Sequence, residues 1–363
     1  MNILVIGNGF DLAHKLPTKY TDFLEWIVSE TEFLEDLMMS GNKFDDLDNF
    51  QFNIPDYKKR KTYIKTAINH QEEVWRCINN NIWLEYFLHV QVEIGKKENW
   101  IDFENEICKV IKSLDYDMRK NRTNLDAHIE YFSEDFFAVY FGRDNNRRKN
   151  EMTITYKQLI SRLEHDLDNL IRVFELYLTE YIELFNINLL SYDIEDLDLD
   201  YVVSFNYTDT FEKVYGKKVE FDYIHGKAGD SNMVIGINEY LEDDRKDKDI
   251  EFIAFKKFYQ RIYKETGCKY KMWVDEIKSN YKECHDLYIF GHSLDNTDGD
   301  VIRDLILNDN VFTTIFYLNK DIMGQQIANL VKVIGQDELI KRTGGITKTI
   351  EFRQQQDMVK MWK

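Results

Sequence analysis

Small, polar and titratable residues follow five apolar runs of this 363-residue sequence, at the points where the runs end. Such runs are typical of buried strands, and in an open α/β sheet ligands bind in the crevice outside the carboxyl ends of the strands. Residues that follow these strands are therefore the first candidates for chemistry. The five groups occupy positions 7–11, 204–209, 225–226, 291–295 and 319.

His225 is the strongest single candidate for acid–base chemistry. It precedes Gly226 at the end of one apolar run, and a free imidazole, with a pKa of about 6.5, suits a general base. His292 follows another run, where a hydrogen-bonding role is an equal alternative. Because most histidines lie on surfaces or in packed positions, the case for His225 depends on its neighbours, and on Asn206 above all.

The segment Gly7-Asn8-Gly9 predicts a tight turn whose backbone N–H groups face a phosphate. An ordinary strand-to-helix turn without a ligand is the alternative. The glycine fingerprint of hydride-transfer enzymes has a third glycine where Leu12 stands, which argues against a conventional dehydrogenase. Asp11 would repel a pyrophosphate, so its carboxylate is better suited to accept a hydrogen bond from a ribose or an amide.

Charge and cysteine usage argue against several functions. With 47 basic and 65 acidic residues the net charge is −18, which disfavours binding to nucleic acid. None of the four cysteines forms a C-x-x-C pair and no two histidines have ligand spacing, so no metal is expected. No signal peptide precedes the first strand and no apolar run reaches about 18 residues, so we expect a cytoplasmic protein without a membrane span.

An α/β fold must position these groups. We predict one parallel sheet wrapped by helices, with the N-terminal strand inside it, and a large α-helical insertion. The predicted domains are a nucleotide-binding α/β domain of residues 1–30 plus 196–363 and a helical insertion domain of residues 31–195, with loops at 45–56 and 141–151. The predicted strands are 3–6, 201–206, 219–226, 233–237, 286–293, 311–319 and 347–352.

One part of the helical middle carries a heptad-like apolar stripe. Packing within a bundle of the same chain is the default explanation, and the seam of a homo-oligomer is the alternative. The stripe consists of Ile160, Leu163, Leu167, Leu170, Phe174, Tyr177, Tyr181 and Leu184.

Taken in order, the strand-end groups resemble the NAD-binding fold of sirtuins, a Rossmann-like parallel sheet. Gly7, Gly9 and Pro17 fall at the offsets of the sirtuin opening, in which G-A-G is followed by G-I-P. Residues 204–208 resemble the sirtuin T-Q-N-I-D motif, and His225 with its following glycine matches the catalytic H-G pair.

Two further matches and three departures define what this resemblance implies. Gly291 and Ser293 match the ends of the sirtuin G-T-S motif, and Asn319 matches the asparagine that holds the adenosine ribose. Asn8 and Asp11 stand where sirtuins have alanine and serine, and the zinc-ribbon cysteine quartet is missing. The resemblance therefore implies NAD hydrolysis, as in defence-associated sirtuin-like proteins, in preference to protein deacylation.

Longer stretches are similar to AbiH, a bacterial abortive-infection family of phage defence. These stretches are ILVIGNGFDLAHKLPTKYTDFL, NWIDFENE, SFNYTDTFE, IHG and IFGHSLDNTD, and they span nearly the whole chain. Together the two resemblances imply an anti-phage effector that binds NAD, hydrolyses its nicotinamide glycosidic bond and responds to a phage-derived trigger.

The resemblance to sirtuins also implies roles for the matching site residues. His225 accepts a proton, and Asn206 fixes the nicotinamide ribose or the attacking water. For Asp11, which departs from the sirtuin pattern, our hypothesis is that it polarises the nicotinamide side. The residues expected to bind the rest of the nucleotide are Gly7, Asn8, Gly9, Gly291, Ser293 and Asn319. Three alternatives are a sensor that binds NAD or ADP-ribose without cleaving it, a nucleotide or nucleic-acid hydrolase, and a structural interaction protein.

Overall fold

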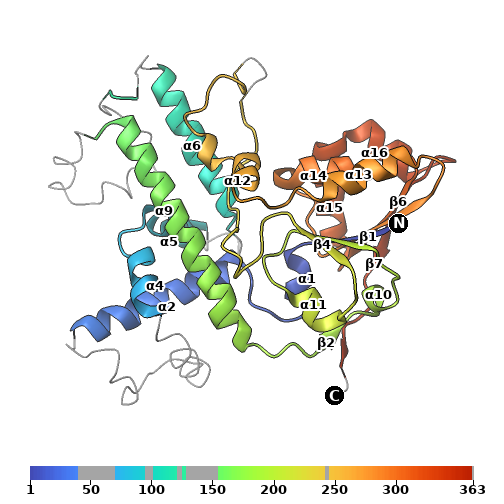
Figure 1. Ribbon diagram of the computed structural model, residues 1–363, viewed down its shortest axis with the longest axis horizontal. Coiled ribbons are helices and arrows are strands. Elements are labelled where there is room, and N and C mark those ends of the chain that lie inside the picture. Colours follow the sequence, from blue (N-terminus) through green and yellow to red (C-terminus); the bar gives the residue numbers. More distant parts are fainter. Residues whose placement is uncertain (40–69, 95–100, 121–124, 128–153, 242–244, 362–363) are drawn as a thin grey trace. The chain divides into compact units, whose positions relative to one another are not determined.

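A six-stranded parallel sheet carries the N-terminal strand in its interior (Figure 1). The computed structural model describes residues 1–39, 70–94, 101–120, 125–127, 154–241 and 245–361. Across the sheet the order is β4 (Glu220–Tyr223), β3 (Tyr201–Ser204), β1 (Asn2–Ile6), β5 (His285–Phe290), β6 (Val311–Tyr317) and β7 (Ile350–Gln354). The predicted α/β class and the parallel sheet that includes the N-terminal strand are confirmed.

Alternate residues of β1 enter two different cores, as the period of a strand requires. Ile3 and Val5 pack in one cluster, and Leu4 and Ile6 in the other. The first cluster includes residues of α13 (Tyr270–Ser279), α14 (Gly299–Ile306), α15 (Lys320–Ile334) and α16 (Gln336–Thr343). The second includes residues of α1 (Asn8–Ala13), α10 (Tyr192–Glu195) and α11 (Thr210–Tyr215). A strand that is apolar on both faces is therefore covered on both faces.

The strand predicted at 233–237 is wrong. Its residues are buried, yet the only bridge in this part of the chain joins Ile237 to Lys256. The Val234 N–H instead donates to the carbonyl of His225 at 2.8 Å. The apolar composition of this run therefore indicates a buried segment, but it does not show that the segment pairs with another strand. A short antiparallel ribbon of β2 (Leu189–Leu190) and β8 (Val359–Lys360) was not predicted.

The described part of the middle of the chain is helical, as predicted. Its helices are α2 (Tyr20–Met39), α4 (Gln71–Ile78), α5 (Ile82–Ile94), α6 (Phe103–Lys120) and α9 (Tyr156–Leu176), and α9 continues into a π-helical turn at Tyr177–Tyr181. Short helices also occur at Ile182–Leu184, Ile253–Phe255, Lys257–Tyr263 and Asn296–Asp298. The loops predicted at 45–56 and 141–151 lie outside the described residues.

The heptad-like stripe is covered within its own helical unit. From Ile160 to Tyr177 its six residues are buried, and Tyr181 and Leu184 are half-buried. The partners are α4 and α5: Trp83 Nε1 donates to the Leu163 carbonyl at 2.9 Å. The predicted homo-oligomer stays a prediction, but this stripe no longer supplies an argument for it.

The described chain forms two compact units. Unit 1 comprises Met1–Thr18, Phe185–Val234 and Gln260–Lys363, and unit 2 comprises Lys19–Leu184 and Ile235–Tyr259. The sheet and all predicted site residues belong to unit 1. The proposed division into domains 1–30 plus 196–363 and 31–195 stays a prediction. Within the described ranges, no helix is long and apolar enough to cross a membrane.

Candidate functional site

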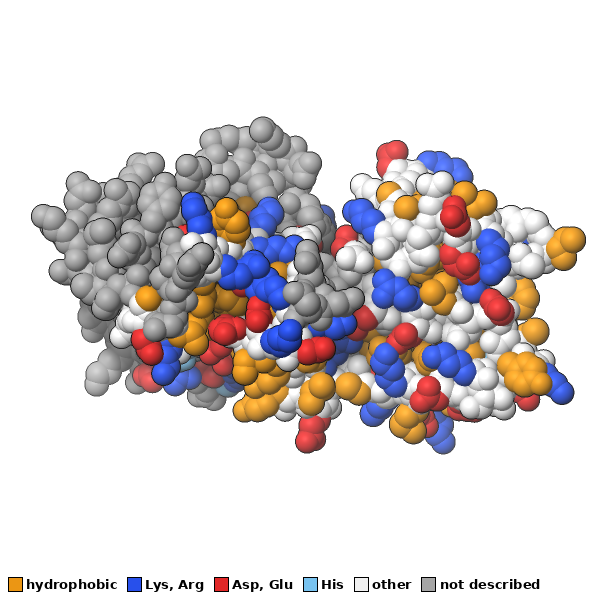
Figure 2. All heavy atoms as spheres, turned by 90° about the horizontal axis from the view of Figure 1, so that it is seen from above, with side chains coloured by type: hydrophobic (Ala, Val, Ile, Leu, Met, Phe, Trp, Pro, Cys, Tyr) orange, Lys and Arg blue, Asp and Glu red, His pale blue; other side chains and the backbone are white. Residues whose placement is uncertain are grey.

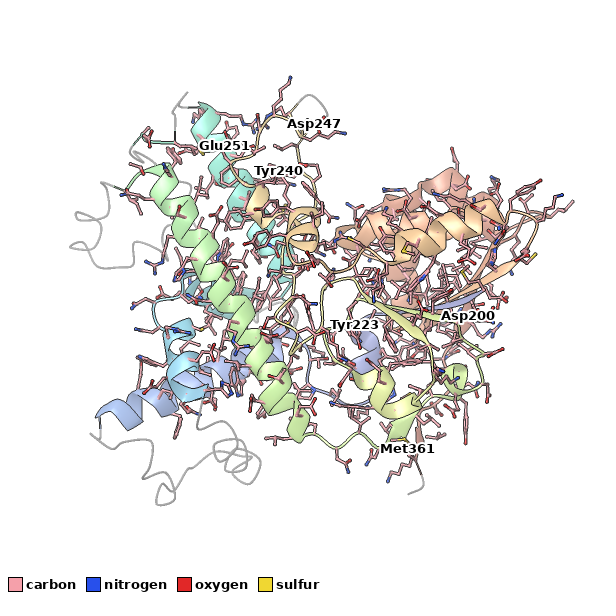
Figure 3. All side chains as sticks on the ribbon, in the orientation of Figure 1. Asp200, Tyr223, Tyr240, Asp247, Glu251 and Met361 are labelled. Atoms are coloured by element: carbon pink, nitrogen blue, oxygen red, sulfur yellow. The ribbon has the colours of Figure 1, made fainter. Side chains whose placement is uncertain are left out.

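The predicted site residues of unit 1 lie in segments that leave the sheet at its carboxyl edge, where the segments after β1, β3, β4 and β5 contact one another. Because all six strands run parallel, the segments that follow β1, β3, β4, β5 and β6 leave the sheet at one edge. Figure 3 labels Tyr223, the last residue of β4, which lies two residues before His225. Asn206 follows β3 by the same interval, and Asn319 follows β6 likewise.

The glycine turn after β1 packs tightly against the segment after β5. The Gly9 N–H donates to the Gly291 carbonyl at 2.8 Å. A Cβ atom on Gly9 would lie 2.7 Å from that same oxygen, and one on Gly7 would lie 2.8 Å from Cδ2 of His292. Close approach of two chain segments therefore accounts for both glycines. For Gly9 to hold a phosphate, its N–H would have to exchange the hydrogen bond to Gly291.

Asn8 begins α1 and has a structural partner. Its Oδ1 accepts a hydrogen bond from Thr18 Oγ1 at 2.6 Å. This bond ties the turn to the end of the first segment of unit 1. The predicted phosphate contact of Asn8 stays a prediction.

Asp11 is a buried carboxyl group on α1, with 1% of the residue exposed. Thr208 Oγ1 donates to its Oδ2 at 2.7 Å, and Thr210 Oγ1 donates to Thr208 Oγ1 at 3.0 Å. Burial raises the pKa of Asp11 from 3.8 to about 6, although hydrogen bonds to Thr208 and Thr210 and the nearby Asn206 amide partly oppose the effect. The residue can therefore gain or lose a proton near neutral pH. Its Oδ1 has no hydrogen-bond partner among the described residues.

Asn206 presents a buried amide that lies close enough to Asp11 to lower the pKa of that carboxyl, yet neither of its side-chain atoms makes a well-formed hydrogen bond within the described chain. Only 4% of the residue is exposed, and its backbone N–H is held by Ser204 Oγ at 3.2 Å. A buried polar group without a hydrogen bond costs about 1–3 kcal/mol, and native proteins retain few of them. The Asn206 amide and Asp11 Oδ1 are thus groups that a polar ligand could satisfy.

His225 is 6% exposed and makes a short polar contact. Its Nε2 lies 3.0 Å from Oδ1 of Asp298. The imidazole also packs near two rings of the segment after β3, with centroids 5.5 Å from Phe205 and 6.0 Å from Tyr207. Asp298 was not among the predicted site residues. The IFGHSLDNTD stretch contains it, but that stretch offers more than one aspartate.

The contact between His225 and Asp298 spans the sheet edge. In the strand order, β3 and β1 lie between β4 and β5. At about 4.8 Å between neighbouring strands, the ends of β4 and β5 are about 14 Å apart. The segment from Gly291 to Asp298 must therefore cross the ends of β1 and β3 to reach His225.

His292 lies in the same crossing segment and faces the other carboxylate oxygen. Its Nδ1 accepts the Leu294 N–H at 2.9 Å, so the proton of the neutral ring is on Nε2. Nε2 lies 3.6 Å from Oδ2 of Asp298, too far for a hydrogen bond. A metal-binding imidazole presents a lone pair, whereas Nε2 here presents a proton. No group of three metal-ligating side chains occurs in the described ranges.

The remaining predicted residues have structural partners as well. Gly291 has a φ of +67°, and a Cβ there would lie 2.2 Å from the Phe10 nitrogen. Ser293 is exposed, and its carbonyl accepts from Asn329 Nδ2 at 2.9 Å. Asn319 is exposed and caps α15, because its Oδ1 accepts the Ile322 N–H. Their contacts with an adenosine stay predictions.

The geometry defines an α/β protein with a polar, largely buried cluster at the carboxyl edge of a parallel sheet. Residues 3–317 match the family described as bacteriophage abortive infection AbiH, and the chain belongs to this family. The match includes every site residue except Asn319. Membership indicates a role in abortive infection by bacteriophage. No curated protein and no solved structure matches the chain.

Proposed function

We propose that unit 1 is a sirtuin-like, Rossmann-type domain that binds NAD and hydrolyses the bond between nicotinamide and ribose during phage abortive infection. One observation carries the proposal. A buried amide and a buried carboxylate oxygen, both without partners in the described chain, lie at the carboxyl edge of a parallel sheet that also carries a buried histidine. The order of the strand-end motifs, which resembles that of sirtuins, supports the choice of ligand.

In the proposed reaction, water replaces nicotinamide at C1′ of the ribose. The C1′–N bond breaks, its electron pair leaves with neutral nicotinamide, and a C1′–O bond forms to water. His225 accepts the proton that the water loses, a contribution typically worth about 10²–10⁴-fold in rate. Asn206 orients the water or the ribose hydroxyls through its unpartnered amide.

Asp11 contributes to the nicotinamide side in this proposal. Near neutral pH its carboxyl exchanges between a charged and a neutral form, because burial raises its pKa to about 6. The ionised form stabilises the positive charge that develops as the glycosidic bond breaks, and Oδ1 is the oxygen without a partner in the described chain. The pyrophosphate lies near Gly7 and Asn8, and the adenosine half near Ser293 and Asn319.

A nucleic-acid substrate is disfavoured by charge. The chain has a net charge of −18. On the face in Figure 2, lysine and arginine side chains are interspersed with aspartate and glutamate. A phosphate backbone is bound best by a continuous basic surface.

The test follows free nicotinamide after purified protein is mixed with NAD, with and without a lysate of phage-infected cells as the source of the trigger. His225→Ala should abolish nicotinamide release and retain NAD binding by calorimetry. His165→Ala, a change of an exposed histidine on α9, is the matched control and should retain both. Binding without cleavage by the unchanged protein would favour the sensor. Absence of both would refute the nucleotide site.

A further inference from the structure

We propose that Asp298 is a positioning residue that holds His225 with Nε2–H toward its carboxylate, so that Nδ1 is the atom that accepts a proton. The inference deepens the proposed function and rests on it for the identity of the reaction. The position of the imidazole is a separate matter, which can be measured without any substrate.

The contact with Asp298 determines which nitrogen of His225 carries the proton. A carboxylate 3.0 Å from Nε2 accepts a hydrogen bond, so the proton of the neutral His225 ring is held on Nε2. The lone pair is then on Nδ1. Both side chains are largely buried, at 7% and 13% exposure, so water competes weakly for this bond.

The crossing segment, from Gly291 to Asp298, is held in place by α15 and by its own conformation. Two amide side chains of α15 hold its backbone: Gln326 Nε2 donates to the His292 carbonyl at 3.1 Å, and Asn329 Nδ2 donates to the Ser293 carbonyl. Leu294 is fully buried with a φ of +59°, a conformation that costs a non-glycine residue roughly 1–2 kcal/mol. A segment held in this way presents its carboxylate in a fixed position.

His292 faces the other oxygen of the Asp298 carboxylate. Because its Nδ1 is engaged by the Leu294 N–H, its Nε2–H faces Oδ2 of Asp298 at 3.6 Å. The two oxygens of one carboxylate therefore face two N–H groups, and neither histidine can turn its Nε2 lone pair toward the carboxylate without repulsion. This arrangement favours the same orientation of His225.

Nitrogen-15 NMR of histidine-labelled protein tests the orientation directly. His225→Gln identifies the His225 signals by their loss. The unchanged protein should show the Nε2–H tautomer at His225. Asp298→Asn should mix the tautomers, since an amide can accept from or donate to the ring. Asp295→Asn is the matched control, because Asp295 lies in the same segment and its Oδ1 accepts from the Thr297 N–H, a cap that asparagine can replace.

Kinetics provide the second readout. In Asp298→Asn, kcat for nicotinamide release should fall at least about 100-fold with KM changed less than about twofold, because a misdirected base impairs the chemical step and not binding. The control should change neither. An Nδ1–H tautomer in the unchanged protein, or an unaltered kcat in Asp298→Asn, overturns the proposal. If the unchanged protein shows the Nε2–H tautomer but does not cleave NAD, the orientation of His225 by Asp298 is confirmed and only the proposed NAD hydrolysis is refuted.

Discussion

Replacing Asp11 by asparagine should make unit 1 more stable at pH 8 and remove its proposed activity. The carboxyl group is buried on α1, and its Oδ1 has no partner in the described chain. Asparagine has the same shape, carries no charge and keeps an oxygen that can accept from Thr208. The change therefore removes a buried charge with little change in packing.

The magnitude follows from the pKa of Asp11. Burial raises it from 3.8 to about 6, which corresponds to about 3 kcal/mol at about 1.4 kcal/mol per pKa unit. Between these two values the folded state binds more protons than the unfolded state. The free energy of unfolding therefore falls as the pH rises through this window. Above pH 6 the fold has lost the full stabilisation of about 3 kcal/mol, because the buried carboxyl is then ionised. An added amide N–H without an acceptor costs part of the gain, so we expect about 1–2 kcal/mol at pH 8.

Hydrogen exchange of peptides from β1 and β3 is the appropriate assay. A chain with two compact units need not unfold in one step, so a single melting temperature would not report on unit 1 alone. Protection should increase in Asp11→Asn at pH 8, after correction for the intrinsic exchange rate. At pH 5 the folded-state carboxyl is mostly neutral and about half of the 3 kcal/mol cost remains, so the cost of the added amide N–H should reduce the gain to about zero or reverse it. Asp230→Asn removes an exposed carboxylate of the same unit and is the control.

Two results would refute this reasoning. Equal gains at pH 5 and pH 8 would mean that a feature other than the charge destabilises the site. A loss of protection at pH 8 would mean that Asp11 is stabilised as a carboxylate by contacts that outweigh its burial.

Three further predictions concern packing. Gly9→Ala should lower the free energy of unfolding of unit 1 by about 1–3 kcal/mol, because the added methyl group clashes with Gly291. Gly324→Ala, in open space on α15, should leave this free energy unchanged or raise it, and hydrogen exchange measures both effects. Asn206→Leu should raise protection of β3 by about 1 kcal/mol and abolish NAD binding by calorimetry. Leu163→Ala should reduce protection of α9 by about 2–5 kcal/mol and leave β1 unchanged.

The sheet could be predicted because its signal is local and strong. A run such as 3–6 is apolar at every position, which indicates a strand covered on both faces, and β1 is such a strand. The run 233–237 is also free of polar side chains and buried, but it has no partner in a β-ladder. The composition of a segment predicts whether it is buried. Whether it pairs as a strand depends on other segments that lie far away in the sequence.

The partners within the site could not be predicted. His225 and Asp298 are 73 residues apart, and the local sequence does not distinguish Asp298 from Asp295 or Asp300 as the carboxylate that faces the imidazole. The close approach of Gly9 to Gly291 is equally non-local. A glycine turn that faces a phosphate and one that faces another chain segment have the same sequence pattern.

The buried groups of unit 1 favour a ligand over a purely structural role. If packing alone determined these positions, an apolar side chain in place of Asn206 and a neutral one in place of Asp11 would each be more stable, because the first change removes a partnerless amide and the second removes a buried charge. Proteins accept such costs mainly at functional sites, where stability is lost in exchange for binding or chemistry. Suppose that both changes stabilise unit 1, that Asn206→Leu abolishes NAD binding and that Asp11→Asn abolishes nicotinamide release. The groups that destabilise the fold and the ligand then belong to the same site. If both changes stabilise unit 1 and neither affects binding or release, the buried polar groups are only a packing defect and the ligand must bind elsewhere.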